Sequence, residues 1–135
     1  ANFLSKNIKL NKKNISVIPY IVGNKIGNAS IENRKADDMN QVIEEGKQKM
    51  ITLDKICSSL EKIHLLKIDV EGYELFVLEG GIRTLKKTEK IFIEVIDELL
   101  NKYSKSSNDL FSFLNKNGFT LFDEIDNKNF IFKKK

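Results

Sequence analysis

The chain has 135 residues, of which 41% are hydrophobic; this is enough for one folded domain with one core and too apolar for a disordered chain. Lysine and arginine total 23 against 19 aspartate and glutamate residues, for a net charge of +4. The basic residues are not interleaved with aromatic ones, and no apolar run reaches the roughly 18 residues of a membrane span, so we expect neither nucleic-acid binding nor a transmembrane helix. The single cysteine, Cys57, excludes an intrachain disulfide and favours a reducing, cytoplasmic setting.

The first part of the chain predicts one helix and short strands. Residues 2–10 carry apolar side chains at helical spacing, and residues 15–22 are rich in β-branched side chains. The only proline, Pro19, lies in that second stretch and predicts an edge or an irregularity in the strand. After a turn, residues 29–31 are expected to form a short return strand. Residues 32–50 are polar and weakly periodic, and we interpret them as a variable insertion with one or two helical turns.

From residue 51 onward, strands and helices are predicted to alternate within a single domain that covers residues 1–135. The expected elements are a short extended piece at 51–53, a helix capped by Asp54 and running to 60, a strand at 64–70, a helix at 75–87, a strand at 90–96, a helix at 108–117 with Gly118 as its C-cap, and a hairpin formed by 119–124 and 129–133. This alternation predicts an α/β fold with a parallel sheet, to which the hairpin adds an antiparallel strand.

Acidic residues gather where two of these strands end. An apolar run ends on Asp69, and Glu71 and Glu74 follow within the turn that leads into a helix. Glu94 lies in the next predicted strand, where a carboxylate costs free energy unless it is paired or useful. Because the carboxyl ends of parallel strands share one edge of the sheet, and ligands bind in the crevice outside them, we expect Asp69, Glu71 and Glu94 to form a site.

The motifs that carry this site resemble the FkbM-type family of S-adenosylmethionine-dependent methyltransferases. The similar segments are Thr52-Leu53-Asp54, Leu66-Lys67-Ile68-Asp69-Val70-Glu71-Gly72-Tyr73-Glu74, Leu78-Glu79-Gly80 and Ile93-Glu94, preceded by residues 7–11 and 22–27. The resemblance covers nearly the whole chain.

The resemblance implies a Rossmann-like class I methyltransferase sheet, mostly parallel, with a C-terminal antiparallel hairpin. The first two strands of that fold, with the glycine-rich cofactor loop and the acid that binds the ribose, would precede Ala1. We therefore expect an N-terminally truncated domain in which the two strands would lie between residues 15–22 and 64–70. The resemblance also implies S-adenosylmethionine as cofactor, with Val22, Gly23 and Asn24 near its adenine end and Asp69 near the methyl group.

The predicted reaction is O-methylation of a sugar or another small molecule that carries a hydroxyl group. Methyl transfer is an in-line displacement that depends on holding donor and acceptor in attack geometry. A carboxylate can orient or deprotonate the acceptor hydroxyl. We assign that role to Asp69, with Glu71 and Glu94 supporting the acceptor side.

Three other interpretations of the same residues stay open. A metal-assisted enzyme would use Asp69, Glu71 and Glu94 as oxygen ligands of a hard cation. A non-catalytic fragment or interaction module would pair with another chain, or with a second copy of itself, through its open sheet edges. A phosphoacceptor role for Asp69 is disfavoured, because no acidic cluster ends an earlier strand.

Overall fold

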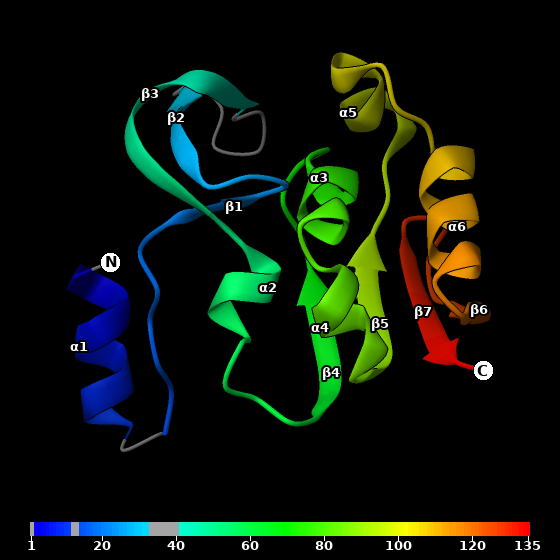
Figure 1. Cartoon of the computed structure of the whole chain (residues 1–135), viewed down its shortest axis with the longest axis horizontal. Helices are drawn as coiled ribbons and strands as arrows, with labels where there is room; N and C mark the ends of the chain where they lie inside the picture. Colours follow the sequence, from blue (N-terminus) through cyan, green and yellow to red (C-terminus); the bar gives the residue numbers. More distant parts are fainter. Residues whose placement is uncertain (1, 12–13, 33–40) are drawn as a thin grey trace.

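The computed structural model describes residues 2–11, 14–32 and 41–135 (Figure 1). Its helices and strands are, in chain order, α1 (Asn2–Leu10), β1 (Ile21–Gly23), β2 (Gly27–Glu32), β3 (Gln41–Thr52), α2 (Leu53–Ile56), β4 (Ile63–Ile68), α3 (Glu74–Glu79), α4 (Ile82–Lys86), β5 (Thr88–Glu94), α5 (Asp97–Leu100), η2 (Asn101–Tyr103), α6 (Ser107–Lys116), β6 (Phe119–Glu124) and β7 (Asn129–Lys134). Among these residues no helix is both long and apolar enough to cross a membrane.

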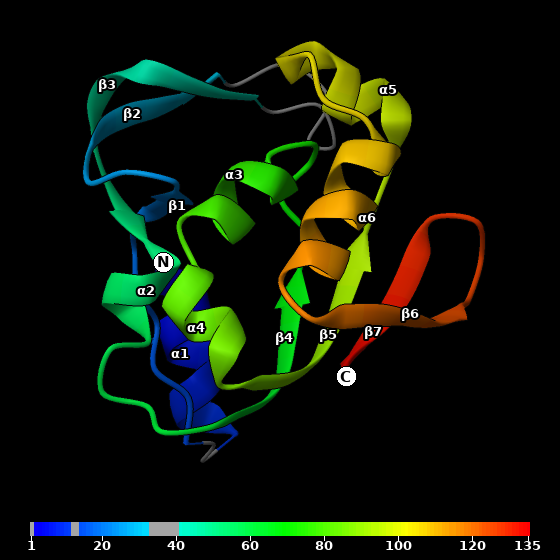
Figure 2. The same cartoon turned by 45° about the vertical axis from the view of Figure 1, so that its right-hand side comes forward.

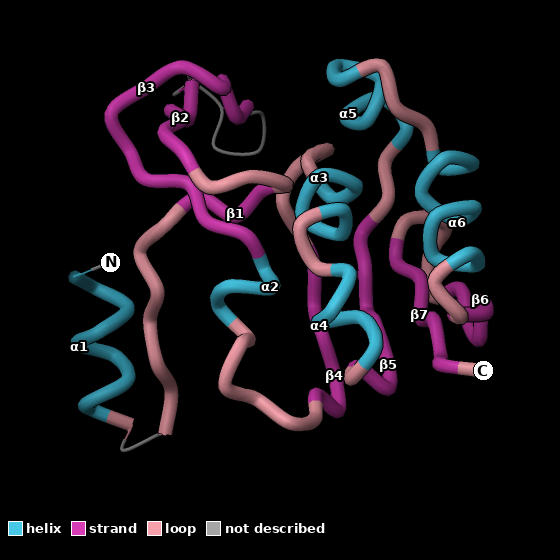
Figure 3. The backbone as a smooth tube through the Cα atoms, viewed as in Figure 1, coloured by secondary structure: helices cyan, strands magenta, loops and turns pink. Residues whose placement is uncertain are grey.

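The strands form two separate mixed sheets (Figure 3). In the first, with order β1-β3-β2, the long central strand pairs in parallel with β1 and antiparallel with β2. In the second, with order β4-β5-β7-β6, only β4 and β5 are parallel. The α/β class is therefore confirmed, but the predicted mostly parallel sheet is not, since two of the five pairings are parallel. The C-terminal hairpin and β2 account for the antiparallel pairs.

The second sheet buries one face and leaves the other partly open. Its register places large apolar side chains side by side on the buried face: Ile68, Ile91, Ile93, Phe130 and Phe132. Helices α3, α4 and α6 cover this face with Leu78, Leu85, Leu110 and Leu114, and Figure 2 shows α4 and α6 lying against the strands. On the opposite face Leu65 is 58% exposed. The main core thus holds the ends of β4 and β5 on a rigid support.

The predictions for the N-terminal part need correction. The predicted strand at 15–22 is mostly irregular, and β1 begins at Ile21, two residues after Pro19, because proline cannot donate to a ladder. The return strand is longer than predicted and pairs with β3. The helical turns predicted in 32–50 are wrong for 41–50, which belong to β3; residues 33–40 lie outside the described residues. Pairing with two strands overrides the weak periodicity there, and Val42 also donates its N–H to the Tyr103 hydroxyl at 2.8 Å.

The helix boundaries around the core also differ from the prediction. Thr52, not Asp54, caps α2, because its hydroxyl accepts the Lys55 N–H, and the helix ends at Ile56 instead of residue 60. The predicted helix at 75–87 is broken into α3 and α4 at Gly80 and Gly81. Gly80 packs so closely on the carbonyl of Gly23 that a Cβ would not fit. Helix α5 and the short η2 were not predicted.

The C-terminal elements agree with the sequence. Helix α6 begins with a capping box between Ser106 and Asp109 and ends at Lys116; its C-cap is Asn117, one residue before the predicted Gly118, which follows with a positive φ of 83°. Strands β6 and β7 form the expected antiparallel hairpin.

Candidate functional site

The three predicted carboxylates lie together at the ends of β4 and β5. Asp69 directly follows β4, and Glu94 is the last residue of β5. The parallel register, which pairs Ile68 with Ile93, brings the next residue on each strand to the same edge. One carboxylate oxygen from each of Asp69, Glu71 and Glu94 lies within 4.8 Å of the others. We call these three residues the acidic rim.

The turn after β4 sets the position of Glu71. Its backbone has a φ of 54°, in the left-handed region, and the following Gly72 has a φ of 98°. The Tyr73 N–H donates to the Val70 carbonyl at 3.3 Å, which closes the turn. A Cβ on Gly72 would come within 2.5 Å of the Leu99 carbonyl oxygen, so only glycine fits. This strained backbone turns the Glu71 side chain back toward Asp69 and Glu94.

Crowded negative charge changes the proton affinity of the acidic rim. Burial raises the pKa of Glu94, and the neighbouring Asp69 and Glu71 raise it further, while Lys128 acts in the opposite direction. The Lys67 ammonium lies 2.6 Å from an Asp69 carboxylate oxygen. Glu94 therefore holds a proton more readily than an ordinary glutamate. Hard cations prefer carboxylate oxygens, so these three residues are also where a metal would bind if the chain takes one.

A cavity of about 610 Å³ opens next to the acidic rim. Its walls come from the first sheet and from the turn after β4, and the lining residues are Pro19, Tyr20, Ile21, Val22, Ile31, Gln41, Val42, Gln48, Lys49, Val70, Glu71 and Tyr73. Its volume lies within the roughly 300–1,000 Å³ of small-molecule sites. Glu71 belongs both to this cavity and to the acidic rim, so a ligand in the cavity would reach the carboxylates.

The residues assigned to the cofactor are divided between two places. Val22 lines the cavity, and Asp69 lies in the acidic rim. Gly23 is buried against Met50 and does not line the cavity. Asn24 donates from its carboxamide nitrogen to Glu79 at 3.1 Å, whereas its carboxamide oxygen is buried and has no hydrogen-bond partner in the described part of the chain.

Sequence reasoning missed the far wall of the cavity. Gln41, Gln48 and Lys49 line it from β3, but their polar, weakly periodic segment was interpreted as an insertion. No local pattern identifies them, because their position depends on pairing with two strands. Glu74 was part of the recognised motif but was assigned no role, although two hydrogen bonds join its carboxylate to the turn after β4.

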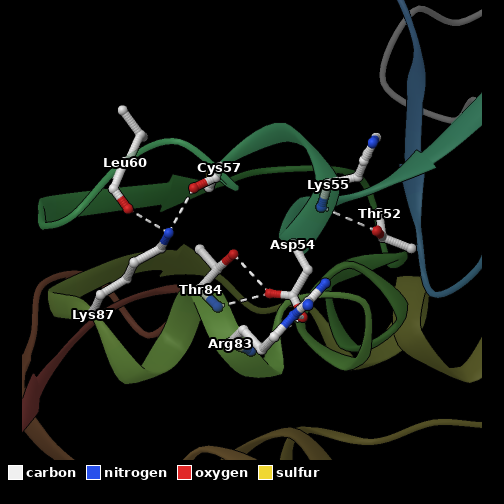
Figure 4. Close-up of polar contacts among 8 residues, drawn as sticks. All are labelled: Thr52, Asp54, Lys55, Cys57, Leu60, Arg83, Thr84 and Lys87. Carbon is white, nitrogen blue, oxygen red and sulfur yellow. Dashed lines mark hydrogen bonds and ion pairs between the residues drawn. The ribbon is translucent and has the colours of Figure 1, made fainter.

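A second carboxylate, Asp54, has a different environment (Figure 4). One of its oxygens accepts from the Thr84 N–H at 2.7 Å and from the Thr84 hydroxyl at 2.8 Å; the other accepts from the Arg83 N–H at 3.1 Å and from Arg83 Nε at 3.3 Å. Burial acts to raise the pKa of Asp54, but these hydrogen bonds outweigh it and lower the pKa. Asp54, Arg83 and Thr84, which we call the Asp54 clamp, join α2 to the first turn of α4.

The architecture is that of an α/β protein with polar residues at the carboxyl ends of adjacent parallel strands, where such proteins bind ligands. The family model for the Methyltransferase FkbM domain matches residues 2–121, which include the acidic rim, the cavity and the Asp54 clamp. The chain therefore belongs to the FkbM methyltransferase family, and by family it is a methyltransferase that needs a methyl donor. No curated protein and no solved structure matches it.

Proposed function

We propose that this chain acts in the transfer of a methyl group from S-adenosylmethionine to a hydroxyl group of a sugar or another small molecule. The observation that carries the proposal is the convergence of Asp69, Glu71 and Glu94 beside a cavity that Glu71 itself lines. Carboxylates at this place can bind and deprotonate a hydroxyl group, and the cavity has room for a small acceptor or for part of the cofactor.

The residues around β1 fit the adenine end of the cofactor. Ile21, Val22 and Val70 give the cavity an apolar wall on which a flat ring can pack. Asn24, which directly follows β1, does not line the cavity, and its buried carboxamide oxygen has no donor among the described residues, so a hydrogen bond to the exocyclic amino group requires its side chain to turn toward the cavity. When bound, S-adenosylmethionine supplies an electrophilic methyl group on a sulfonium.

The acidic rim would act on the acceptor. Asp69, whose carboxylate lies 2.6 Å from the Lys67 ammonium, orients the acceptor hydroxyl and takes its proton as the oxygen becomes nucleophilic. Glu71 and Glu94 accept hydrogen bonds from, or donate a proton to, neighbouring groups of the acceptor. The single thiol, Cys57, is free and buried, which agrees with a reaction in the reducing cytoplasm.

Calorimetric titration with S-adenosylhomocysteine, the product form of the cofactor, tests the cofactor assignment. We expect micromolar binding by the chain, and binding at least tenfold weaker by Val22→Lys, which places a charged side chain in the cavity wall. Leu121→Lys, which adds the same charge to an exposed site on β6, is the matched control and should bind like the unchanged chain. A folded chain that does not bind would contradict the proposal.

A non-catalytic interaction module is the second candidate, and the sheet edges favour it. Among the described strands, β4 pairs only with β5, and β1 pairs only with β3, so each offers an edge for another strand. In this case sedimentation velocity would show a mass that rises with protein concentration, and S-adenosylhomocysteine would not bind. A constant monomer mass together with cofactor binding would exclude this candidate.

A further inference from the structure

Glu74 is a buried carboxylate that the proposed chemistry does not use. It is the first residue of α3, and only 2% of its surface is exposed. One carboxylate oxygen accepts the Gly72 N–H at 3.0 Å and the Val70 N–H at 3.2 Å. The second oxygen is also buried, with no hydrogen-bond partner among the described residues. Burying a carboxylate with one unpaired oxygen costs free energy. The protein therefore bears a cost to place an acceptor against this one turn, and that placement needs an explanation.

We propose that Glu74 is a positioning residue for the acidic rim. Its carboxylate accepts hydrogen bonds from the Val70 and Gly72 N–H groups, on both sides of Glu71, and so holds Asp69 and Glu71 next to Glu94. The expected effect on methyl transfer rests on the proposed function, whereas the stabilisation of the turn by these hydrogen bonds does not.

The local backbone shows why the turn needs this support. Glu71 has a left-handed φ of 54°, which a residue with a side chain adopts at a cost. Such conformations persist only where the surroundings over-determine them. The Glu74 carboxylate satisfies one N–H before Glu71 and one after it, so the residue between them has little freedom. Since Glu71 is part of both the acidic rim and the cavity lining, its direction decides how the two are connected.

The surroundings of Glu74 add to this rigidity. The neighbouring Tyr73 stacks on Phe76 with ring centroids 4.5 Å apart, and Tyr103 packs edge-on against both rings. The Tyr103 hydroxyl in turn accepts the Val42 N–H of β3. These contacts connect the start of α3 to β3 of the first sheet.

Two substitutions separate the hydrogen-bonding role of Glu74 from its volume. Glu74→Met fills a similar space without an acceptor, and Glu74→Gln keeps a carbonyl oxygen that can accept both N–H groups. Thr88→Val is the control: Thr88 is 2% exposed, its hydroxyl donates to the Thr84 carbonyl, and it lies at the opposite end of β5 from Glu94. Comparing the three proteins distinguishes a specific effect on the turn from a general loss of buried hydrogen bonds.

The first measurement is amide hydrogen exchange by NMR, which needs no methyl acceptor. We expect Glu74→Met to speed exchange of the Val70 and Gly72 amides at least tenfold relative to the Ile93 amide, while Glu74→Gln and Thr88→Val leave that ratio unchanged. The second measurement is methyl transfer: kcat should fall about 100-fold in Glu74→Met, as for a misplaced catalytic group, with the acceptor KM little changed. Glu74→Gln should restore kcat to within about threefold of the unchanged chain.

The outcomes separate the two proposals. Protected Val70 and Gly72 amides in Glu74→Met, or loss of protection in Glu74→Gln as well, would overturn the positioning role whether or not any activity is found. A third outcome is rapid amide exchange in Glu74→Met but not in Glu74→Gln, in a chain that transfers no methyl group. It would support the role of Glu74 in holding the turn and would count against the proposed function instead. If Glu74→Met transfers methyl groups at the full rate, the turn is not needed for catalysis.

Discussion

The Asp54 clamp and the acidic rim are both built on carboxylates, but the pKa of the central carboxyl is lowered in the first and raised in the second. Asp54 accepts four hydrogen bonds from Arg83 and Thr84, which lower its pKa despite burial. Glu94 faces Asp69 and Glu71, and burial together with these neighbours raises its pKa. The first region stabilises an anion, and the second concentrates anions that repel one another.

This difference indicates what each region is for. A carboxylate surrounded by donors lowers the free energy of the folded state and has little capacity left for a ligand. Carboxylates that repel one another destabilise the fold and persist where an external proton, hydroxyl group or cation makes use of them. Both regions lie within the segment that matches the family, so family membership alone does not tell which acid is structural and which acids are candidates for the reaction.

The largest effect is expected at the acidic rim. Asp69→Asn should lower kcat for methyl transfer by about 100- to 1,000-fold, because the amide cannot take the acceptor proton. The unfolding midpoint in urea should change little, since Asp69 makes its ion pair at the surface with Lys67. Transfer of a labelled methyl group under single-turnover conditions measures the effect, with Asp123→Asn on the exposed β6 as the control. Full activity of Asp69→Asn would show that the assigned role is wrong.

The opposite behaviour is expected at the Asp54 clamp. Asp54→Ala should lower the free energy of unfolding by about 2 to 3 kcal/mol, mostly through the lost Thr84 bonds, while activity per folded molecule is kept. The Arg83 side chain is 80% exposed and adds little. Since the pKa of Asp54 is lowered in the folded state, its contribution is present above the ordinary value of 3.8 and is lost as pH falls through the folded-state pKa. Urea titrations at pH 7 and pH 3 measure the free energy of unfolding of both proteins. An equal difference between Asp54→Ala and the unchanged chain at the two pH values would contradict this assignment.

A smaller effect of opposite sign is expected at Glu94. Its pKa is raised in the folded state, so its contribution to stability is present below the ordinary value of 4.5 and is lost as pH rises through the folded-state pKa. Glu94→Gln should therefore stabilise the protein at pH 7, by about 0.2 to 1 kcal/mol, and have no effect at pH 4.

The matched control for Glu94 is on the same strand. Hydrogen bonds from Lys62 and His64 lower the pKa of Glu89, so Glu89→Gln should not stabilise the protein at pH 7. Thermal unfolding at the two pH values compares both variants. Stabilisation by both substitutions would mean that general charge reduction, and not repulsion within the acidic rim, is the cause.

The smallest expected effect is that of metal removal. If the carboxylates act directly on the acceptor, EDTA should leave the rate of methyl transfer unchanged, and added Mg²⁺ should not raise it. The rate is compared before and after dialysis against chelator, with restoration by Mg²⁺ or Ca²⁺ as the control. Loss of activity that a cation restores would make Asp69, Glu71 and Glu94 metal ligands and favour the metal-assisted alternative.

Local rules predicted some elements well and failed at others for identifiable reasons. The helix at 108–117 and the turn at Gly118 depend on residues close in sequence and were predicted to within about one residue, whereas the equally local capping box of Ser106 and Asp109 was not predicted. Asp54 also looked like a local helix cap, but its partners are 29 and 30 residues away in α4. A capping rule considers only the helix that follows in sequence, so it could not find them.

The sequence by itself determined the α/β class, the family and the positions of the acidic residues, because strand period, turn residues and the motif around Asp69 are all local properties. Only the tertiary structure decided which acids meet, since the convergence of Asp69, Glu71 and Glu94 depends on the parallel pairing of β4 with β5 and on the left-handed turn at Glu71. It also decided that residues 41–52 form a strand in the cavity wall, because hydrogen bonds to β1 and β2 on its two sides outweigh weak helical propensity.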